Sequence, residues 1–589
     1  MPATSHRHHQ RFPPHVLREY ALLADGERGA LVGPRGDVVW MCVPQWHDDA
    51  VFAALLDGPG FYSVTPTDAN MVWGGSYEDG TLIWHSRWVT SDAIIECREA
   101  LAHPGDPGRA VLLRQIRAVH GRASVDVLLD VQAGFGKHAM TDVHRDGEVW
   151  EGRSGKLRFR WTGAGGAQRD DQGALAQTIE IDEGQHHDLV LEIGDSLHDE
   201  PVRPEGAWAA TAHAWATDVP DMSESIAPHD AQMSYAVLRG LTSSTGAMVA
   251  AATMGLPERA EAGRNYDYRY AWIRDQCYAG QAVGSFAPLP LMDSAVRFVS
   301  ERILADRADL RPAYTIDGTY LPKEHDLDLP GYPGGVAKEG NWVNNQFQLD
   351  SCGEALLLLA TAAHHDHLDV EHWDAVQVLV DVIEQKWQQP DNGIWELAPK
   401  RWAHSRLMCA AGLRQISHYS PRRDAARWMS LADTLVASAA SDCVTSTGRW
   451  QRAPDDDRVD AALLLPALRG AVPADDPRSI GTYEAVRRDL GREGYVYRFS
   501  QDPRPLEDAE GAFLLCGFLM ALSAQQQGDE LDAMRWFERN RSACGSPGLY
   551  TEEFDIEQRQ LRGNFPQAFV HALMFEAAHR LTGPGGPRP

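Results

Sequence analysis

The sequence predicts two domains, an N-terminal β-sandwich followed by a closed ring of helical hairpins whose loops form the functional site. Three observations predict this fold. With 589 residues the chain is too long for one ordinary hydrophobic core. Its first third alternates apolar and polar residues in the manner of strands. After about residue 225 the apolar runs become long and take the helical period.

The predicted strands begin with Gly29–Val32 and Asp37–Trp40, which a Pro-Arg-Gly turn separates. Later strand-like segments include TLIWHSRWV, AVLLRQIRAV, SVDVLLDVQ and HHDLVLEIGD. Turn residues divide them at short intervals, which is typical of a β-sandwich. We therefore expect a disordered tail over 1–15, a sandwich over 16–205 and a linker with a helix over 206–228.

The remaining part, 229–589, is predicted to be the catalytic domain. Its helical runs include MSYAVLRGLTSSTGAMVAAA, SCGEALLLLATAAHH, SRLMCAAGLRQI, GAFLLCGFLMALSAQQ and FPQAFVHALMFEAAHRL. Gly-, Pro- and Asp-rich loops, several of them long, lie between these runs. Such hairpins with long loops fit a closed helical toroid with the site at one end.

The bulk properties restrict the partners. The formal net charge of −28 disfavours nucleic acid and anionic membranes. No run of 18 apolar residues and no apolar signal core occur, so a cytoplasmic protein without a membrane partner is expected. The eight cysteines show neither CxxC pairs nor zinc spacing, which indicates reduced thiols. A homo-oligomer remains open.

The first chemical signal is RNYDYRYAWIRD, Arg264 to Asp275. It concentrates aromatic and charged residues without a helical or strand period. Arg274 and Asp275 could hold sugar hydroxyls while aromatics such as Tyr266 stack on the apolar sugar face. A structural arginine–aspartate network beneath a loop explains the same residues.

The second signal is PDNGIWELAP, where turn chemistry presents Trp395 and Glu396. A carboxyl beside an indole ring can be partly desolvated, which keeps it protonated as a general acid. A lone surface glutamate is the alternative.

The third signal is LYTEEFD followed by RGNFPQAFVHAL. Asn564, Gln567 and His571 could orient a carboxylate or a water beside the paired glutamates. Alternatively, Asn564 caps the last helix.

These motifs together resemble glycoside hydrolase family 15, the glucoamylase, glucodextranase and bacterial trehalase family. The resemblance runs along nearly the whole chain, from LREYALLADGERGALVGPRGDVVWMCVP through GYPGG, NQFQLDSCGE and EGAFLLCGF to GNFPQAFVHA. It implies an N-terminal β-sandwich followed by a catalytic (α/α)6 barrel. It also implies an inverting exo-acting hydrolase that releases β-glucose from trehalose or short α-glucans, without a cofactor or metal.

The resemblance assigns roles motif by motif. Glu396 in the Trp-Glu pair matches the general acid, and Glu552 matches the general base, with Glu553 as the neighbouring alternative. Arg274 and Asp275 match the pair that grips the non-reducing glucose, and Arg498 in GYVYRF matches an arginine of the same subsite. Inversion requires the two carboxyls to stand about 6.5–9.5 Å apart, so that a water fits between them.

Four departures from the family pattern bear on substrate choice. Val39 precedes the first tryptophan in place of an aspartate, and Gln45-Trp46-His47 replaces an Arg-Phe-Asp segment. Lys338 to Trp342 replaces an Arg-Val-Gly-Asn run, and Gln276-Cys277-Tyr278 replaces a small residue and an aromatic. Both catalytic motifs are intact, so these changes concern the sugar or its leaving group.

Two other kinds of function fit the same scaffold. A phosphorylase needs a basic phosphate pocket in place of the base, and an epimerase needs histidines, for which His404 and His571 are the candidates. A non-catalytic carbohydrate-binding protein would bind the sugar without turning it over. The presence of both glutamates favours the hydrolase.

Overall fold

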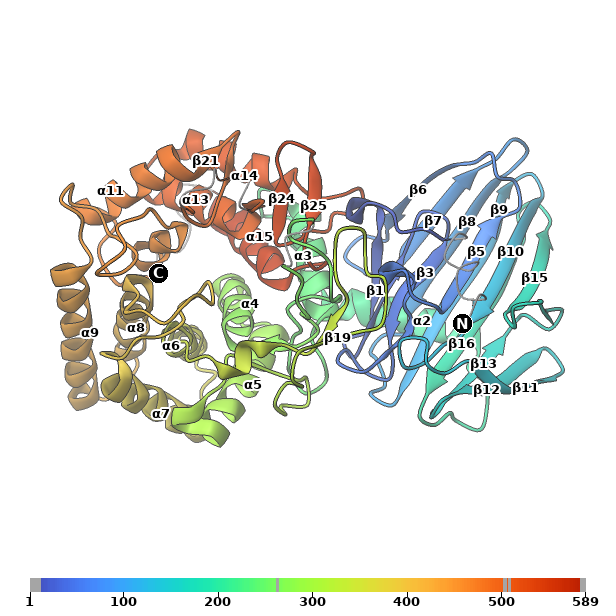
Figure 1. Cartoon of the computed structure of the whole chain (residues 1–589), viewed down its shortest axis with the longest axis horizontal. Coiled ribbons are helices and arrows are strands. Elements are labelled where there is room, and N and C mark those ends of the chain that lie inside the picture. Colours follow the sequence, from blue (N-terminus) through green and yellow to red (C-terminus); the bar gives the residue numbers. More distant parts are fainter. Residues whose placement is uncertain (1–11, 261–263, 502–505, 507–509, 583–589) are drawn as a thin grey trace.

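The computed structural model describes residues 12–260, 264–501, 506 and 510–582. It shows a sandwich of two antiparallel sheets beside a ring of helices (Figure 1). One sheet has the order β1 (Ala21–Ala24), β2 (Gly29–Val32), β3 (Asp37–Cys42), β5 (Phe61–Pro66), β10 (Ala123–Asp130), β15 (Leu175–Ile181) and β14 (Gln168–Arg169), and β4 (Ala50–Phe52) pairs with β3. The predicted fold class is confirmed.

The second sheet completes the sandwich, and its side chains form the other half of the core. Its order is β11 (Met140–Asp146), β12 (Val149–Ser154), β13 (Leu157–Thr162), β16 (His186–Gly194), β9 (Arg109–His120), β8 (Ile94–Leu101), β7 (Trp84–Val89) and β6 (Val72–Tyr77). The indole of Trp161 in β13 meets the ring of Tyr62 in β5 edge to face, at 5.8 Å between centroids. Such contacts join the two inner faces.

The connection to the ring contains helix α2 (Pro204–Asp218), which begins two residues before the linker expected over 206–228. The predicted tail begins outside the described residues. Within it, however, Phe12 is buried against Phe61 and Leu128, and the Tyr332 hydroxyl donates to the His15 carbonyl at 2.7 Å. The packed chain therefore begins earlier than predicted, because an aromatic ring close to the N-terminus covers the sandwich.

Six helices of the described residues form a closed inner ring, in which each packs against the next. They are α4 (Ile273–Phe286), α6 (Asp350–His364), α8 (Ala403–Ser417), α10 (Leu465–Leu468), α13 (Leu514–Gln526) and α15 (Ala568–Arg580). They are buried on nearly all sides, as helices enclosed by others must be. Gly353 and Gly412 let α6 and α8 approach closely, since a Cβ on Gly353 would lie 2.4 Å from the carbonyl carbon of Met408.

Six more helices form the outer layer and have one polar face. They are α3 (Pro228–Gly240), α5 (Pro290–Asp306), α7 (Val370–Lys386), α9 (Arg422–Asp442), α11 (Pro477–Ala485) and α14 (Glu530–Arg541). The helix predicted from Met233 onward ends at Gly240 instead of continuing to Ala252. A turn at Ser243 to Gly246, with Gly246 at φ +93°, breaks the helical period there.

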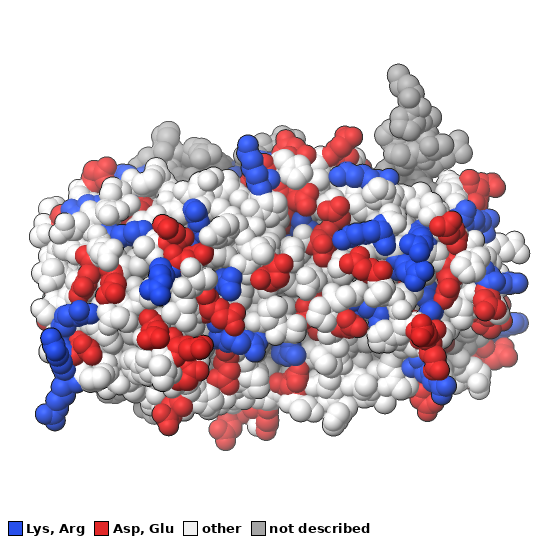
Figure 2. Space-filling model, turned by 90° about the horizontal axis from the view of Figure 1, so that it is seen from below, with Lys and Arg blue, Asp and Glu red and all other residues white. Residues whose placement is uncertain are grey.

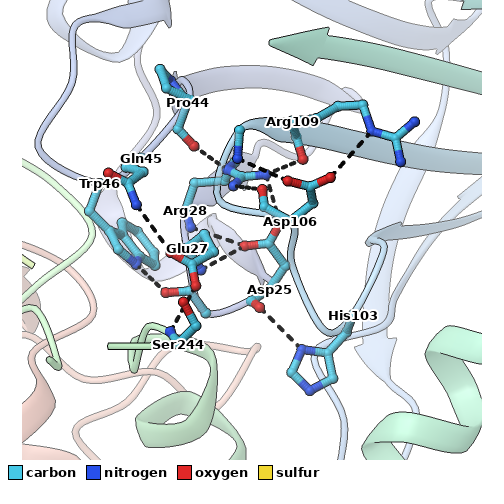
Figure 3. Close-up of polar contacts among 12 residues, drawn as sticks. Asp25, Glu27, Arg28, Pro44, Gln45, Trp46, His103, Asp106, Arg109 and Ser244 are labelled. Atoms are coloured by element: carbon cyan, nitrogen blue, oxygen red, sulfur yellow. Dashed lines mark hydrogen bonds and ion pairs between the residues drawn. The ribbon is translucent and has the colours of Figure 1, made fainter. Parts of the chain in front are cut away.

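The turn between β1 and β2 ties the sandwich to the barrel (Figure 3). Arg28 is fully buried, pairs with Asp25 at 3.2 Å and donates to the carbonyls of Pro44, Asp106 and Arg109. Across the interface, the backbone N–H of Ser244 donates to the Glu27 carboxylate at 2.7 Å. The two domains therefore meet through a partly buried polar contact.

The surface carries both signs of charge. Acidic and basic side chains are interspersed over the face drawn in Figure 2, with acidic residues in excess over the whole chain. In the part of the chain that the structure describes, no helix combines the length and apolar character needed to cross a bilayer.

Candidate active site

A cavity of 320 Å³ lies where the inner helices α4, α13 and α15 begin. Arginines, glutamates and aromatic rings line it together, a mixture suited to a polar ligand with apolar faces. Its walls include Glu258, Arg264, Tyr266, Tyr268, Arg274, Tyr278, Trp342, Trp395, Glu396, Arg498, Gln501, Phe513 and Glu552.

The segment before α4 alternates its side chains between the cavity and the sandwich. Tyr266 and Tyr268 line the cavity with their rings stacked, 6.1 Å between centroids and 7° between planes. Asp267 and Arg269 point the other way. The guanidinium of Arg269 bonds the Asp267 carboxylate at 2.7 Å and the carbonyl oxygen of Asp48 in the sandwich at 2.6 Å. The sandwich therefore supports the segment from behind.

Glu396 sits in a tight turn with its backbone in the left-handed region, at φ +57°. This conformation costs a non-glycine residue about 1–2 kcal/mol, so the surrounding contacts must hold it. Asn392 does so: its side chain accepts the N–H of Phe347 at 3.1 Å and donates to the carbonyl of Leu397 at 2.8 Å. The carboxylate of Glu396 accepts the indole N–H of Trp272 at 3.0 Å.

Glu552 lines the same cavity from another loop and is almost fully buried. The hydroxyl of Tyr268 donates to its Oε2 at 3.2 Å. Burial, followed by the negative charge of Glu258, raises the pKa of Glu552 well above its ordinary value. The adjacent Glu553 does not line the cavity and begins strand β24 (Glu553–Asp555).

Glu553 belongs instead to an ion-pair cluster behind Glu552. It accepts the backbone N–H of Gly511 at 2.8 Å and lies 3.5 Å from Arg264 and 3.7 Å from Arg498. Burial and the nearby Glu258 raise the pKa of Glu553 to about 8. Arg498 is held at the cavity wall by the Glu510 carboxylate at 2.5 Å.

Arg274 and Asp275 occupy the first turn of α4. The Arg274 guanidinium donates to the carbonyl of Ile394 at 2.9 Å, bonds Asp275 at 3.2 Å and lies 3.6 Å from Glu396. Asp275 is buried beneath it and does not line the cavity, and burial raises its pKa to about 6. Trp395 lines the cavity and donates its indole N–H to Asp460 at 2.9 Å.

Besides Asp275, two residues predicted to bind substrate do not line the cavity. The amide of Asn564 donates to the carbonyl of Tyr266 at 2.8 Å and accepts the Thr253 hydroxyl at 3.0 Å, so it fixes the Tyr266 segment. Gln567 is buried, and its backbone N–H bonds the carbonyl of Tyr550. The alternative role of Asn564 is also wrong, because α15 begins at Ala568 with Gln567 as its N-cap residue.

Neither histidine considered for an epimerase lines the cavity. Burial lowers the pKa of His571 to about 3, and its ring contacts Ser234 and the N–H of Tyr550. Burial, helped by the charge of Arg274, lowers the pKa of His404 to about 3. Both rings are therefore neutral parts of the barrel interior.

Sequence reasoning missed Glu258, Tyr268 and Trp272 as residues of the site. The two aromatics lie inside a segment that was singled out, and its alternation of aromatic and charged residues was the signal that could have identified them. Glu258 follows a proline in a loop that looks like ordinary surface, and no sequence signal marks it. Of the departures from the family pattern, only Tyr278 and Trp342 reach the cavity.

No group of three or more His, Cys, Asp or Glu side chains within the described ranges is arranged to hold a metal ion. The expectation that the chemistry needs no metal or organic cofactor stays a prediction.

Comparison with known proteins gives two family matches. The model described as glycosyl hydrolases family 15 matches residues 233–579, and the one described as trehalase-like, N-terminal matches residues 13–212. The boundary between them falls inside helix α2 and the loop that follows it.

Individual relatives align over almost the full length. A trehalase of Mycobacterium tuberculosis is 29% identical over 96% of this chain and 89% of its own. A trehalase of Thermoplasma acidophilum is 26% identical over 94% of this chain and 98% of its own. The crystal structure of a bacterial glucoamylase complexed with acarbose has the same fold, with a TM-score of 0.67 at 13% identity, over 96% of this chain and 94% of that one.

Proposed function

The chain belongs to glycosyl hydrolase family 15 and is a glycoside hydrolase, and from this premise we propose that it removes terminal α-linked glucose with inversion. The observation that carries the proposal is the placement of Glu396 and Glu552 on one cavity. Each accepts a hydrogen bond from a different aromatic donor of the same segment, Trp272 for Glu396 and Tyr268 for Glu552.

In this proposal Glu396 is the general acid. It protonates the glycosidic oxygen as the bond to the anomeric carbon breaks, while Trp272 and the turn around Asn392 hold the carboxyl in place. The strained backbone of Glu396 supports the assignment, since left-handed non-glycine residues concentrate at functional sites.

Glu552 is the proposed general base, which takes a proton from the attacking water on the opposite face of the sugar. It must be ionised to do so. Because burial and Glu258 raise its pKa, kcat/KM should fall as the pH drops through that raised value. Of the two adjacent glutamates, Glu552 is favoured because it alone lines the cavity.

We propose that the remaining polar groups hold the non-reducing glucose. Arg274 and Arg498 present guanidinium groups at the cavity wall, and Tyr266 and Trp395 offer ring faces for the apolar side of the sugar. Asp275 acts through Arg274, which it orients by a paired contact at 3.0 Å. A cavity of 320 Å³ is in the range of small-molecule sites and suits an exo-acting enzyme.

Trehalose is the proposed preferred substrate, with short α-glucans next. Support comes from the relatives that are named trehalases and align over more than nine-tenths of this chain. A cytoplasmic location is part of the proposal and is supported by the eight free cysteines, seven of them buried. Nucleic acid is not a proposed partner, in line with the net charge of −28.

The test is to incubate the protein with trehalose, maltose, isomaltose and soluble starch and to follow the released sugar by proton NMR. Early β-glucose from one of them supports inversion and identifies the substrate class. Because the leaving half of trehalose keeps its α configuration, inversion of trehalose gives equal amounts of β- and α-glucose, and early release of α-glucose alone contradicts inversion. Binding of a sugar without any release supports the non-catalytic alternative, and release only in the presence of phosphate supports a phosphorylase.

A further inference from the structure

The hydroxyl of Tyr268 lies between two buried carboxyls of the cavity wall. It is 3.2 Å from Oε2 of Glu552 and 3.5 Å from Oε1 of Glu258. A tyrosine hydroxyl has one hydrogen and can donate it to only one of the two. Burial and the surrounding carboxylates raise the pKa of Tyr268 well above its ordinary value, so the hydroxyl keeps that hydrogen.

The charges around these groups do not balance. Among the described residues the cluster contains four carboxyls, Glu258, Glu510, Glu552 and Glu553, and two guanidinium groups, those of Arg264 and Arg498. If all four carboxyls were ionised, two negative charges would remain uncompensated in a buried site, which is strongly unfavourable. Glu553, whose pKa is raised to about 8, accounts for one proton near neutral pH, and the one negative charge still in excess favours a second proton on another carboxyl.

The distribution of ion pairs indicates where that proton resides. Arg264 contacts Glu258 directly and lies within 3.6 Å of both Glu510 and Glu553. Arg498 contacts Glu510 and lies 3.7 Å from Glu553. Glu552 has no ion pair within 4 Å among the residues that the structure places. It is the least compensated carboxyl, although the proposed mechanism needs it as an anion.

We propose that Glu258 and Glu552 share a single proton through the hydroxyl of Tyr268, and that this sharing prepares Glu552 to act as the base. The inference rests on the proposed role of Glu552. In one state the Glu552 carboxyl donates to the Tyr268 oxygen, and Tyr268 donates to the Glu258 carboxylate. In the other state the direction of both hydrogen bonds is reversed.

The transfer between the two states conserves atoms and charge. Glu552 gives its proton to the Tyr268 oxygen while Tyr268 passes its own hydrogen to Glu258. Glu552 becomes a carboxylate, Glu258 becomes a carboxylic acid and Tyr268 is unchanged. Glu258 acts on the reaction through Tyr268 and is thus a positioning residue.

The sign of the resulting pH effect can be predicted. Glu258→Gln removes the neighbouring negative charge, so Glu552 ionises more easily. The acid limb of the kcat/KM profile should move to lower pH by about 1 unit or more. Tyr268→Phe removes only the hydrogen bond that stabilises ionised Glu552, so the same limb should move to higher pH.

The experiment measures kcat/KM against pH for wild type and both variants, on the α-glucoside that wild type cleaves best. Glu354→Gln is the matched control: Glu354 is a buried carboxyl of α6 that bonds Gln281 at 2.9 Å and does not line the cavity. This control should leave the limb in place. A purely structural role of Glu258 would lower kcat/KM equally at every pH.

An unmoved limb in Glu258→Gln, or a shift to higher pH, overturns the inference. If circular dichroism shows that Glu258→Gln does not fold, Tyr268→Phe alone decides. In that case an acid limb that stays in place or moves to lower pH overturns the inference. Wild type that cleaves no α-glucoside refutes the proposed function and this inference with it. Active wild type with unshifted variants refutes only the proton sharing.

Discussion

Trp272 and Tyr268 meet edge to face, with ring centroids 5.5 Å apart and planes at 72°, and each donates to a different one of the two proposed catalytic carboxyls. Two residues of one segment, four positions apart, therefore contact both glutamates. A displacement of that segment moves the proposed acid and the proposed base together.

The roles of the two glutamates should be distinguishable on a substrate whose leaving group needs no protonation. Fluoride leaves without being protonated, so α-glucosyl fluoride requires only the base. Glu396→Gln is expected to lower kcat on trehalose by about 10²–10⁴-fold but to retain most activity on the fluoride. Glu552→Gln should lose activity on both. Equal losses on both substrates for Glu396→Gln would show that the acid was assigned wrongly.

Trp272→Phe should weaken catalysis without unfolding the protein. A hydrogen bond to a charged group contributes about 1.5–3 kcal/mol, so kcat/KM on trehalose should fall by about 10–100-fold. The matched control is Trp88→Phe, which removes a 2.9 Å bond to the Pro34 carbonyl inside the sandwich. Steady-state kinetics and thermal unfolding of both variants give the comparison. Similar kinetic losses in the control would point to a global effect.

Trp342 should act on the leaving group. It lines the cavity, its side chain is 43% exposed, and its helical turn leads to Phe347, which bonds Asn392 of the Glu396 loop. It therefore lies on the side of the proposed acid. Trp342→Ala is expected to lower kcat/KM by about tenfold on disaccharides, the loss of one stacking contact, and to have little effect on α-glucosyl fluoride.

The control for that experiment is Trp73→Ala, which removes a tryptophan of similar exposure, 41%, from strand β6 of the sandwich. It should behave as wild type on all substrates. Equal losses on disaccharide and fluoride for Trp342→Ala would place Trp342 at the glucose instead.

Arg28 should be essential for stability. Its buried guanidinium pairs with Asp25 and bonds three carbonyl groups, so Arg28→Ala leaves a buried carboxylate without its partner. Removing one member of such a pair costs about 3–5 kcal/mol. The exposed pair of Arg87 and Glu96 is the control, and Arg87→Ala should cost less than about 1 kcal/mol. Chemical denaturation of each variant provides the measurement.

Glu553 should make stability depend on pH. Its pKa is raised to about 8, so between its ordinary value of 4.5 and 8 the folded state keeps a proton that the unfolded state releases. Its contribution to stability is therefore complete below pH 4.5 and is lost as the pH rises through 8. Glu553→Gln cannot lose that proton, so its denaturation midpoint should fall less than that of wild type between pH 5 and 8. Parallel curves would contradict the assignment.

The sequence predicted the β-sandwich and the helical barrel because the spacing of apolar residues is a local property of the chain. Runs such as SCGEALLLLATAAHH appear as α6 almost residue for residue, since helix periodicity survives whatever the neighbours are. The helix expected beyond Gly240 failed because the run of small apolar residues near Ala250 serves an extended loop against the segment of Tyr268 and Tyr270. Tertiary contacts, not propensity, decide such positions.

The candidate site was only partly predictable for the same reason. Glu396, Glu552, Arg274 and Arg498 could be named because whole motifs carried them. Glu258 could not, because its importance comes from its approach to Tyr268 and Glu552, which the fold brings together from distant parts of the chain. Asn564 and Gln567 were predicted to bind substrate but do not line the cavity, since a motif does not show which of its polar side chains face the cavity.

The anchoring of Arg269 to the carbonyl groups of the sandwich limits how freely this protein could be recombined. A chimaera with a foreign sandwich would retain every side chain that lines the cavity. It would still lose the hydrogen bonds from Arg269 to the sandwich that support the segment of Tyr266 and Tyr268 from behind. The sandwich and the barrel are therefore not interchangeable modules. Changes in sugar preference can arise from the loop around Trp46 and Asp48, at positions that never meet the sugar.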